Sequence, residues 1–229
     1  MTKGIIYFSD GRPDPKILKM CQDQLKEANL PIVNCSLVPM DFANKNIVLN
    51  LKRGYETYFK QIITTLENSH SDIIFFCEHD VLYPPSHFDF TPPTKDKFYY
   101  NQNWIKIDWP YTKGVAWDAD QVSGLCCYRE LALEWYKAKL QEYQNAPLKT
   151  TDKNLELGNK EWDRKFEPGS GTNQAITWRS VEPYVDIRQS KTVTKNKWSI
   201  ADFRDKTTAK NFQEKQCPQW AKLIIGGEQ

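Results

Sequence analysis

The sequence predicts an α/β fold in which a mostly parallel sheet is flanked by helices. Three short apolar runs, at residues 4–9, 32–37 and 73–77, alternate with two segments of helical periodicity. A chain that alternates strand and helix in this way builds a right-handed parallel sheet by default. The 229 residues are enough for one sizeable core, so we expect a single domain rather than two independent ones.

A turn signal separates the first strand from the first helix. The strand leads into Asp10-Gly11, a residue pair that favours a turn. Pro13 or Pro15 then suits the first turn of a helix that runs to about Asn29, because the first helical position tolerates the missing N–H of proline.

The second helix and the third strand have the clearest patterns. Apolar side chains recur at helical spacing from about Arg53 to Glu67, which indicates an amphipathic helix. Its apolar positions are Tyr55, Tyr58, Phe59, Ile62, Ile63 and Leu66. The third strand, residues 73–77, consists of five consecutive apolar residues, as is typical of a strand buried on both faces.

The second half of the chain is less regular. Pro84-Pro85 and Pro92-Pro93 interrupt regular structure. The elements predicted beyond them are strands near 97–100 and 104–107, a strand at 121–128, a helix from Arg129 to about Tyr143, a helix at 172–180 and a strand at 184–187. The polar segment 145–171 contains glycine and proline and is predicted to form an active-site loop.

Glu78-His79-Asp80, which directly follows the third strand, is the most informative motif. Ligands of open α/β sheets bind at the carboxyl ends of the strands, where these carboxylates would lie. A hard divalent cation prefers oxygen ligands and usually keeps waters and a substrate phosphate in its shell. We therefore expect Asp80 to contact Mn²⁺ or Mg²⁺, and Glu78 to contact the metal shell or a sugar hydroxyl. A solvated acidic turn is the alternative interpretation.

This motif and its surroundings resemble the GT-A fold glycosyltransferases, which use a nucleotide-sugar donor and a divalent metal. Gly4–Asp10 looks like their first strand, and Gln121–Glu130 is similar to the strand and helix that border their acceptor pocket. Val185–Gln189 resembles an Asp-Ile-Arg-His segment of phage-type members, with Gln189 in place of the histidine. The resemblance covers about residues 4–190. It implies a GT-A-like, Rossmann-type sheet with an acceptor-side mixed sheet.

The resemblance also implies a role for each part of the domain. Residues 1–83 would form the nucleotide-binding half, 84–188 the acceptor-side half and 189–229 a basic C-terminal tail. The candidates for donor binding are Ser9, Asp10, Arg12, Arg53, Glu78, Lys195 and Lys197. The candidates for metal contact are Asp80, Glu78 and Gln189. Two alternatives stay open: Asp10 could serve only its turn, and Asp186 with Arg188 could form a structural ion pair.

Sugar transfer from a nucleoside diphosphate requires charge neutralisation and, if configuration inverts, a general base. A metal on Asp80 and lysines of the tail would neutralise the leaving diphosphate. The base is expected from a loop or helix start beyond the acceptor strand, where the candidates are Glu167, Glu161 and Asp163. Glu167 is favoured because it precedes the Gly-rich turn Pro-Gly-Ser-Gly. A retaining enzyme needs no such base, and the sequence leaves the stereochemistry open.

The tail bears on the identity of the acceptor. Residues 189–216 carry seven basic and three acidic side chains, a net charge of +4 against +2 for the whole chain. Such a stretch can hold a pyrophosphate or a nucleic-acid backbone, although a solvated surface is the alternative. With the likeness to phage-type members, it suggests a UDP-sugar donor and a 5-hydroxymethylpyrimidine base in DNA as acceptor, flipped into the pocket. A saccharide acceptor, a nucleotidyltransferase and a non-catalytic nucleic-acid-binding module are the alternatives.

Composition limits the cellular location and the kinds of site that we expect for this protein. No apolar stretch approaches the ~20 residues that span a bilayer, and no signal pattern opens the chain, so we expect a cytoplasmic protein (in the host cytoplasm, if it acts during phage infection) without a membrane partner. Six cysteines without a C-x-x-C pair indicate buried thiols rather than a zinc or redox site. Trp104, Trp109 and Trp117 fall outside periodic segments and are candidates for stacking on a sugar or base ring.

Overall fold

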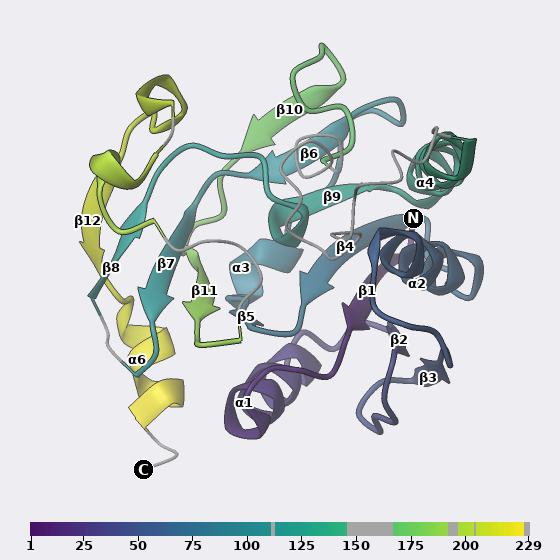
Figure 1. Ribbon diagram of the computed structural model, residues 1–229, viewed down its shortest axis with the longest axis horizontal. Helices are drawn as coiled ribbons and strands as arrows, with labels where there is room; N and C mark the ends of the chain where they lie inside the picture. Colours follow the sequence, from purple (N-terminus) through teal and green to yellow (C-terminus); the bar gives the residue numbers. More distant parts are fainter. Residues whose placement is uncertain (111–112, 146–166, 192–196, 204, 227–229) are drawn as a thin grey trace, which may run out of the picture.

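Two β-sheets and the helices around them make up the protein (Figure 1). The computed structural model describes residues 1–110, 113–145, 167–191, 197–203 and 205–226. The strands of the first sheet are β1 (Lys3–Ser9), β2 (Ile32–Ser36), β3 (Lys45–Val48), β4 (Ile73–Glu78), β6 (Phe98–Asn101), β9 (Leu125–Tyr128) and β10 (Ala175–Trp178). Those of the second are β5 (Val81–Leu82), β7 (Trp104–Asp108), β8 (Lys113–Ala116), β11 (Tyr184–Arg188) and β12 (Gln213–Gln216). The helices are α1 (Pro15–Lys26), α2 (Tyr55–Glu67), α3 (Pro85–Phe88), α4 (Arg129–Asn145) and α6 (Gln219–Gly226).

The α/β fold predicted from the sequence is confirmed. The first sheet has the order β10-β6-β9-β4-β1-β2-β3, and its β4-β1-β2-β3 part is parallel. The second sheet has the order β12-β8-β7-β11-β5 and is mixed, because β11 runs parallel to β7 but antiparallel to β5. The helix predicted after the first turn begins at Pro15, where the side chain of Asp14 accepts a 2.9 Å hydrogen bond from the N–H of Lys16.

The order of the parallel strands reverses at β1. The chain leaves β1 through α1 toward β2 and β3 on one side, and returns through α2 to β4 on the other side. The carboxyl ends of β1 and β4 therefore flank a topological switch point, where open α/β sheets form a crevice. This arrangement places the end of the first strand beside the Glu78-His79-Asp80 motif.

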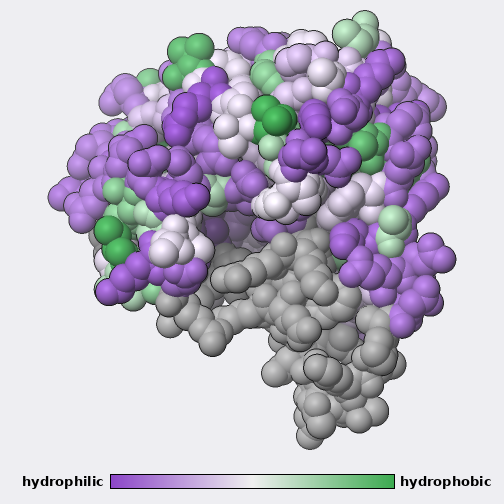
Figure 2. Space-filling view, turned by 90° about the horizontal axis from the view of Figure 1, so that it is seen from above, coloured by the Kyte–Doolittle hydropathy of each residue, from purple (hydrophilic) through white to green (hydrophobic). Residues whose placement is uncertain are grey.

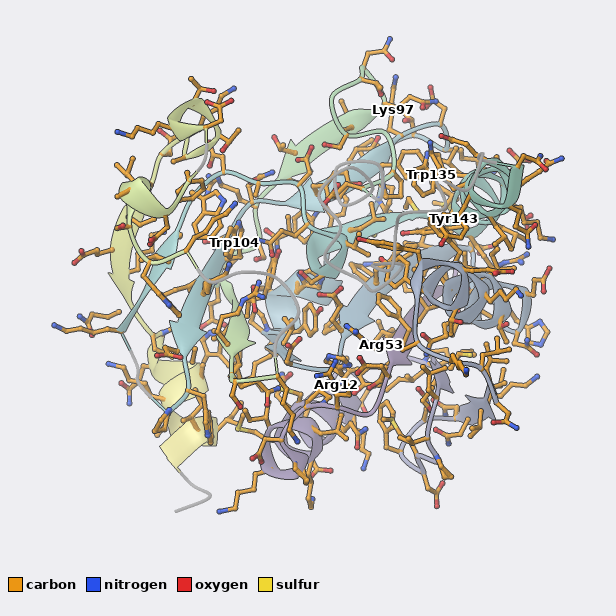
Figure 3. The ribbon with its side chains drawn as sticks, in the orientation of Figure 1. Arg12, Arg53, Lys97, Trp104, Trp135 and Tyr143 are labelled. Carbon is orange, nitrogen blue, oxygen red and sulfur yellow. The ribbon has the colours of Figure 1, made fainter. Side chains whose placement is uncertain are left out.

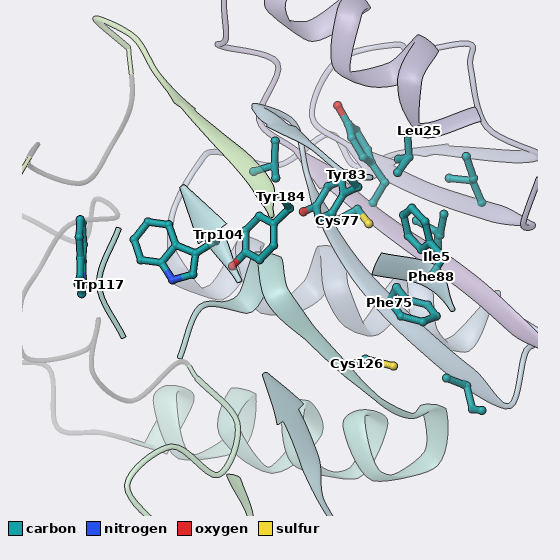
Figure 4. Close-up of a cluster of buried hydrophobic side chains, with 14 of the residues drawn as sticks. Ile5, Leu25, Phe75, Cys77, Tyr83, Phe88, Trp104, Trp117, Cys126 and Tyr184 are labelled. Atoms are coloured by element: carbon teal, nitrogen blue, oxygen red, sulfur yellow. The ribbon is translucent and has the colours of Figure 1, made fainter. Parts of the chain in front are cut away.

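Alternate side chains of β1 enter two different cores. Ile6 and Phe8 pack in a cluster with apolar residues of α2 and α4, whereas Ile5 and Tyr7 pack in a second cluster on the opposite face. The second cluster extends from the first sheet through aromatic residues of the second one (Figure 4). Tyr83 and Tyr184 stack there with ring centroids 5.7 Å apart. The two sheets thus share one of the cores.

The strands of the second sheet are two-faced. Ile105 and Ile107 of β7, like their β11 partners Val185 and Ile187, pack in a cluster with apolar residues of α1 and α6. The intervening positions of both strands point to the other face, because side chains alternate along a strand. These positions hold Trp104, Lys106 and Asp108 on β7 and Tyr184, Asp186 and Arg188 on β11.

One predicted element was wrong, and another began later than predicted. The segment predicted as a helix at 172–180 contains strand β10, which pairs parallel with β6. Pairing at the sheet edge outweighed any local helical tendency of Ile176-Thr177-Trp178, residue types that favour strands. The strand predicted at 121–128 begins only at Leu125, after a 3₁₀ turn at Val122–Gly124. A Cβ on Gly124 would lie 2.7 Å from Oη of Tyr184, so the turn passes close to the second sheet.

The prediction that tryptophans stack on a ligand is wrong for Trp104 and Trp117, which are buried, whereas Trp109 is only partly buried. Trp104 and Trp117 lie in the shared core with their ring centroids 4.6 Å apart, and Trp109 packs against the core between β7, β11 and α1. The six cysteines all lie in the described part of the chain, where they are buried, as predicted, and form no disulfide. None of the described helices combines the length and apolar content that crossing a bilayer requires. The face in Figure 2 is mainly hydrophilic, with hydrophobic residues scattered over it.

Candidate functional site

The ends of β1 and β4 are joined by polar side chains at the switch point. Oγ of Ser9 and Nδ1 of His79 are 2.8 Å apart and share a hydrogen bond. Asp10, just beyond β1, accepts a 2.7 Å hydrogen bond from Nε of Arg53 in a largely buried ion pair. The same carboxylate accepts a 3.1 Å bond from the N–H of Arg12. Asp10 therefore both forms its turn and holds Arg53, whose position is marked in Figure 3.

Arg53 keeps donor capacity toward the crevice. Its Nη2 is buried, and none of the described residues supplies a hydrogen-bond acceptor for it. A buried donor without an acceptor is destabilising by about 1–3 kcal/mol, so it is expected where a ligand supplies the missing partner. Arg12, in contrast, has an exposed side chain.

The acidic turn after β4 is held in place by the backbone and by α1. The N–H of Glu78 donates a 3.1 Å bond to Oη of Tyr83. The side chain of Gln24, on α1, accepts a 3.0 Å bond from the N–H of Tyr83 and also donates to its carbonyl oxygen. The carbonyl oxygen of Asp80 accepts a 2.8 Å bond from the N–H of Ile187 on β11. The turn is therefore fixed against both sheets.

The two carboxylates of this turn resist ionisation. Burial, followed by the negative charges of Asp80 and Asp186, raises the pKa of Glu78 to about 8. Burial also raises the pKa of Asp80, and the charge of Asp186 acts in the same direction. The charge of His79 acts to lower the pKa of Asp80. The charge of Arg188 acts to lower the pKa values of both carboxyls. A nearby cation would stabilise the ionised forms of these two carboxylates, because an opposite charge favours ionisation.

The donor set at this point fits a divalent cation. Mg²⁺ is commonly bound through one or two carboxylates, with waters and substrate phosphates completing its shell. In the described part of the chain, no group of three or more His, Cys, Asp or Glu side chains is arranged to hold a metal ion. The carboxylates of Glu78 and Asp80 are the candidate ligands at this turn, Asp186 lies within electrostatic reach of both, and the rest of a shell would come from substrate and water.

A charged row faces these carboxylates from the second sheet. We use this name for Lys106 of β7 together with Asp186 and Arg188 of β11. Nη2 of Arg188 donates a 2.7 Å bond to Oδ2 of Asp186, and the side chains are only 12% and 6% exposed. The ion pair left open by the sequence is therefore present. Lys106 is the register partner of Asp186 and, at 3% exposure, is equally buried.

Lys106 was missed by the sequence analysis, although the sequence contains a signal. The run Trp-Ile-Lys-Ile-Asp alternates apolar and polar residues, as does Tyr-Val-Asp-Ile-Arg at residues 184–188. Such alternation predicts that one face of each strand is apolar and that the lysine points to the opposite face. The pattern does not predict that the two strands pair with each other. This pairing makes the polar face of the strands an interior surface.

Glu167 lies near the acidic turn. Its charge contributes, after burial, to the raised pKa values of Glu78 and Tyr100, so its carboxylate is within electrostatic reach of both. The following turn is tied to β6, because Oη of Tyr100 donates a 2.7 Å bond to the carbonyl oxygen of Pro168. Three other predicted site residues lie outside the described residues: Glu161, Asp163 and Lys195.

Two further candidates have contacts of their own. The side-chain oxygen of Gln189 accepts a 2.7 Å bond from the N–H of Asp14, at the start of α1. The oxygen predicted to reach a metal is therefore engaged with the backbone. Nζ of Lys197 lies 4.6 Å from the ring centroid of Phe203. Its charge is among those that lower the pKa of Lys106, after burial and Arg188, so Lys197 lies near the charged row.

Comparison with known proteins shows only distant similarity. No protein-family model matches the sequence, and no curated protein matches it. Among solved structures, the chain is similar to a glycosyltransferase involved in the glycosylation of the major capsid of PBCV-1, with a TM-score of 0.42 and 11% identity over 80% of this chain and 93% of that one. It is also similar to the bifunctional IspDF from Campylobacter jejuni, with a TM-score of 0.36 and 9% identity over 63% of this chain and 48% of that one.

A third similar structure is the inositol-1-phosphate CTP transferase from T. maritima, with a TM-score of 0.37 and 11% identity over 99% of this chain and 95% of that one. Two of these three proteins are named as transferases. All three TM-scores are below 0.5, so none of these similarities assigns an activity or a substrate to this chain.

Proposed function

We propose that this chain is a metal-dependent glycosyltransferase that moves a sugar from a UDP-sugar to an acceptor hydroxyl. The observation that supports the proposal most directly is the position of Glu78 and Asp80. Two carboxylates with raised pKa values lie at the switch point between β1 and β4, where open α/β sheets bind nucleotides. A bound cation would relieve their repulsion and at the same time attract a diphosphate.

The nucleoside of the donor would occupy the crevice beside β1. That strand end is surrounded by Ser9, Asp10, Arg12 and Arg53. The buried Nη2 of Arg53 is a donor for which the described residues supply no acceptor. A carbonyl of the base, a ribose hydroxyl or a phosphate oxygen would each satisfy it. Asp10 holds the guanidinium in position and thereby acts on the nucleotide through Arg53.

Asp80, with Glu78 beside it, would hold Mn²⁺ or Mg²⁺ against the diphosphate. The ion supplies positive charge where the leaving UDP develops negative charge. Lys197 and, outside the described residues, Lys195 would contribute further positive charge to the diphosphate. Gln189 is the weakest of the proposed metal contacts, because its oxygen already accepts the bond from Asp14.

Glu167 is proposed as the general base of an inverting reaction, with Glu161 and Asp163 as the other candidates. The acceptor oxygen attacks the anomeric carbon, the bond from that carbon to the diphosphate oxygen breaks, and the acceptor proton passes to the carboxylate. The nearness of Glu167 to Glu78 supports this role. A 5-hydroxymethylpyrimidine base in DNA is proposed as the acceptor because of the basic tail, with a saccharide hydroxyl as the alternative.

Donor hydrolysis tests the proposal. Purified protein with Mn²⁺ is incubated with UDP-, GDP- and TDP-sugars, and the released nucleotide is measured with Asp80→Asn alongside. We expect release from a UDP-sugar that falls at least 100-fold in the variant. The reaction is then repeated with hydroxymethylated DNA and with saccharides, and transfer to saccharides alone would overturn the DNA acceptor. Equal release by Asp80→Asn, or no release and no thermal stabilisation by any donor, would overturn the enzyme class.

A further inference from the structure

The side-chain amino group of Lys106 is buried and contacts aromatic rings instead of an anion. Its Nζ lies 4.5 Å from the ring centroid of Trp117 and 5.8 Å from that of Trp104. Only 3% of the residue is exposed. Within the described part of the chain, this nitrogen forms no hydrogen bond and no ion pair. The indole faces orient the ammonium but do not neutralise it.

A second unsatisfied donor lies beside it. The indole nitrogen of Trp104 is buried and has no acceptor among the described residues. Trp104 and Lys106 are two positions apart on β7 and therefore share the face of the strand that carries the charged row. Figure 4 shows the ring of Trp104 between those of Trp117 and Tyr184. Two neighbouring donors thus lack the acceptor that buried polar groups normally have.

Charges of both signs lie near Lys106. Arg188 and Lys197 lie close enough to lower its pKa, whereas Asp186, which also pairs with Arg188 at 2.7 Å, and Asp80 act to raise it. Burial, followed by the charge of Arg188, lowers the pKa of Lys106 to about 7. A buried amino group without an acceptor or a counter-charge of its own is unfavourable, and a ligand that supplies both would stabilise it.

We propose that Lys106, together with Arg188 and Lys197, binds a phosphate group of a substrate on the inner face of the second sheet. This inference deepens the proposed function and rests on it for the identity of the substrate. A phosphate suits the site because it carries at least one negative charge and several acceptor oxygens, which match the amino group of Lys106, the two further cations and the unsatisfied indole donor of Trp104. The phosphate belongs either to the donor diphosphate or to the acceptor.

Phosphate binding to matched variants tests this inference. Inorganic phosphate and UDP are titrated, separately and together, into wild-type protein, Lys106→Met, Lys106→Arg and Lys95→Met, with calorimetry and tryptophan fluorescence as readouts. Methionine keeps the length and the apolar stem of Lys106, and arginine keeps its charge. Lys95 is the control because it also lies over an aromatic ring, 5.5 Å from the centroid of Tyr128, but has an exposed side chain.

We expect Lys106→Met to weaken phosphate binding at least 10-fold, Lys106→Arg to recover part of it and Lys95→Met to bind as wild type. If UDP displaces inorganic phosphate, the site receives the donor diphosphate; if both bind together, it receives an acceptor phosphate. Phosphate binding that Lys106→Met leaves unchanged, or no binding of either probe at millimolar concentration, would overturn the inference. Binding that is lost in Lys106→Met while no nucleotide-sugar is hydrolysed would retain this site and refute the proposed function alone.

Discussion

The carbonyl oxygen of Asp80 accepts a 2.8 Å hydrogen bond from the N–H of Ile187, and this bond joins the acidic turn to the strand that carries the charged row. Two residues that are far apart in the chain are thereby held at one place. Because β5 follows Asp80 directly and pairs with β11, the turn is the point at which the first sheet continues into the second. The charges of the turn and of the charged row act on one another's pKa values, so the two lie within electrostatic reach.

Divalent cations should stabilise the folded protein through Asp80. A ligand present at 100 times its dissociation constant adds about 2.7 kcal/mol to the free energy of unfolding, and each kcal/mol corresponds to roughly 2–4 °C in a domain of this size. We expect Mn²⁺ to raise the melting temperature of wild-type protein by several degrees and that of Asp80→Asn by much less. Equal shifts in both proteins, measured by scanning calorimetry, would contradict a metal site at this turn.

Glu78 should make the protein less stable as the pH rises. Its carboxyl loses its proton near pH 4.5 in the unfolded chain and near pH 8 in the folded protein, where Asp80, Asp186, Arg188 and Glu167 face it. Between these values the folded state binds more protons, so its contribution to stability is present at low pH and is lost as the pH rises through about 8.

The comparison of Glu78→Gln with wild type isolates this contribution. We expect the melting temperature of the variant to rise relative to that of wild type between pH 5 and pH 8.5. Glu214→Gln, at an exposed position of β12, is the control and should keep a constant offset from wild type. Parallel profiles for Glu78→Gln and wild type would show that the carboxyl titrates normally.

Removal of Arg188 should be strongly destabilising. The Arg188→Met variant would leave Asp186 buried without its 2.7 Å partner, a change that typically lowers the free energy of unfolding by about 3–5 kcal/mol. Arg179→Met is the control, because Arg179 and Asp118 form a 3.2 Å pair that is 56% and 33% exposed and should be worth about 0–1 kcal/mol. Urea denaturation measures both. The double variant Asp186→Asn/Arg188→Met should regain part of the loss.

Gly114 should not tolerate a side chain. A Cβ at this position would lie 2.0 Å from the carbonyl oxygen of Lys106 on the neighbouring strand, and that backbone atom cannot move aside easily. We expect Gly114→Ala to lose about 1–3 kcal/mol or more of stability, the usual effect of overpacking. Gly226→Ala, at the end of α6, has no atom within 4 Å of the added Cβ and should be neutral in the same urea titration.

Local sequence patterns predicted a substantial part of the fold and of the site. The helical spacing in α2, the continuous apolar run of β4 and the turn after β1 were each read at nearly their observed places. The acidic motif could be placed at a strand end because that position follows from the run before it. These features depend on burial of one face or both, which leaves its period in the sequence.

The tertiary structure decided which elements meet. The sequence contains the alternating polarity of residues 104–108 and 184–188, but only their pairing encloses Lys106 beside Asp186 and Arg188. It likewise did not show that 175–178 would add to β6 as an edge strand, because a strand of four residues takes its conformation from its partner. Strand order also decided that the ends of β1 and β4 meet at the topological switch point. Periodicity reports how a segment is buried, whereas long-range packing selects what it is buried against.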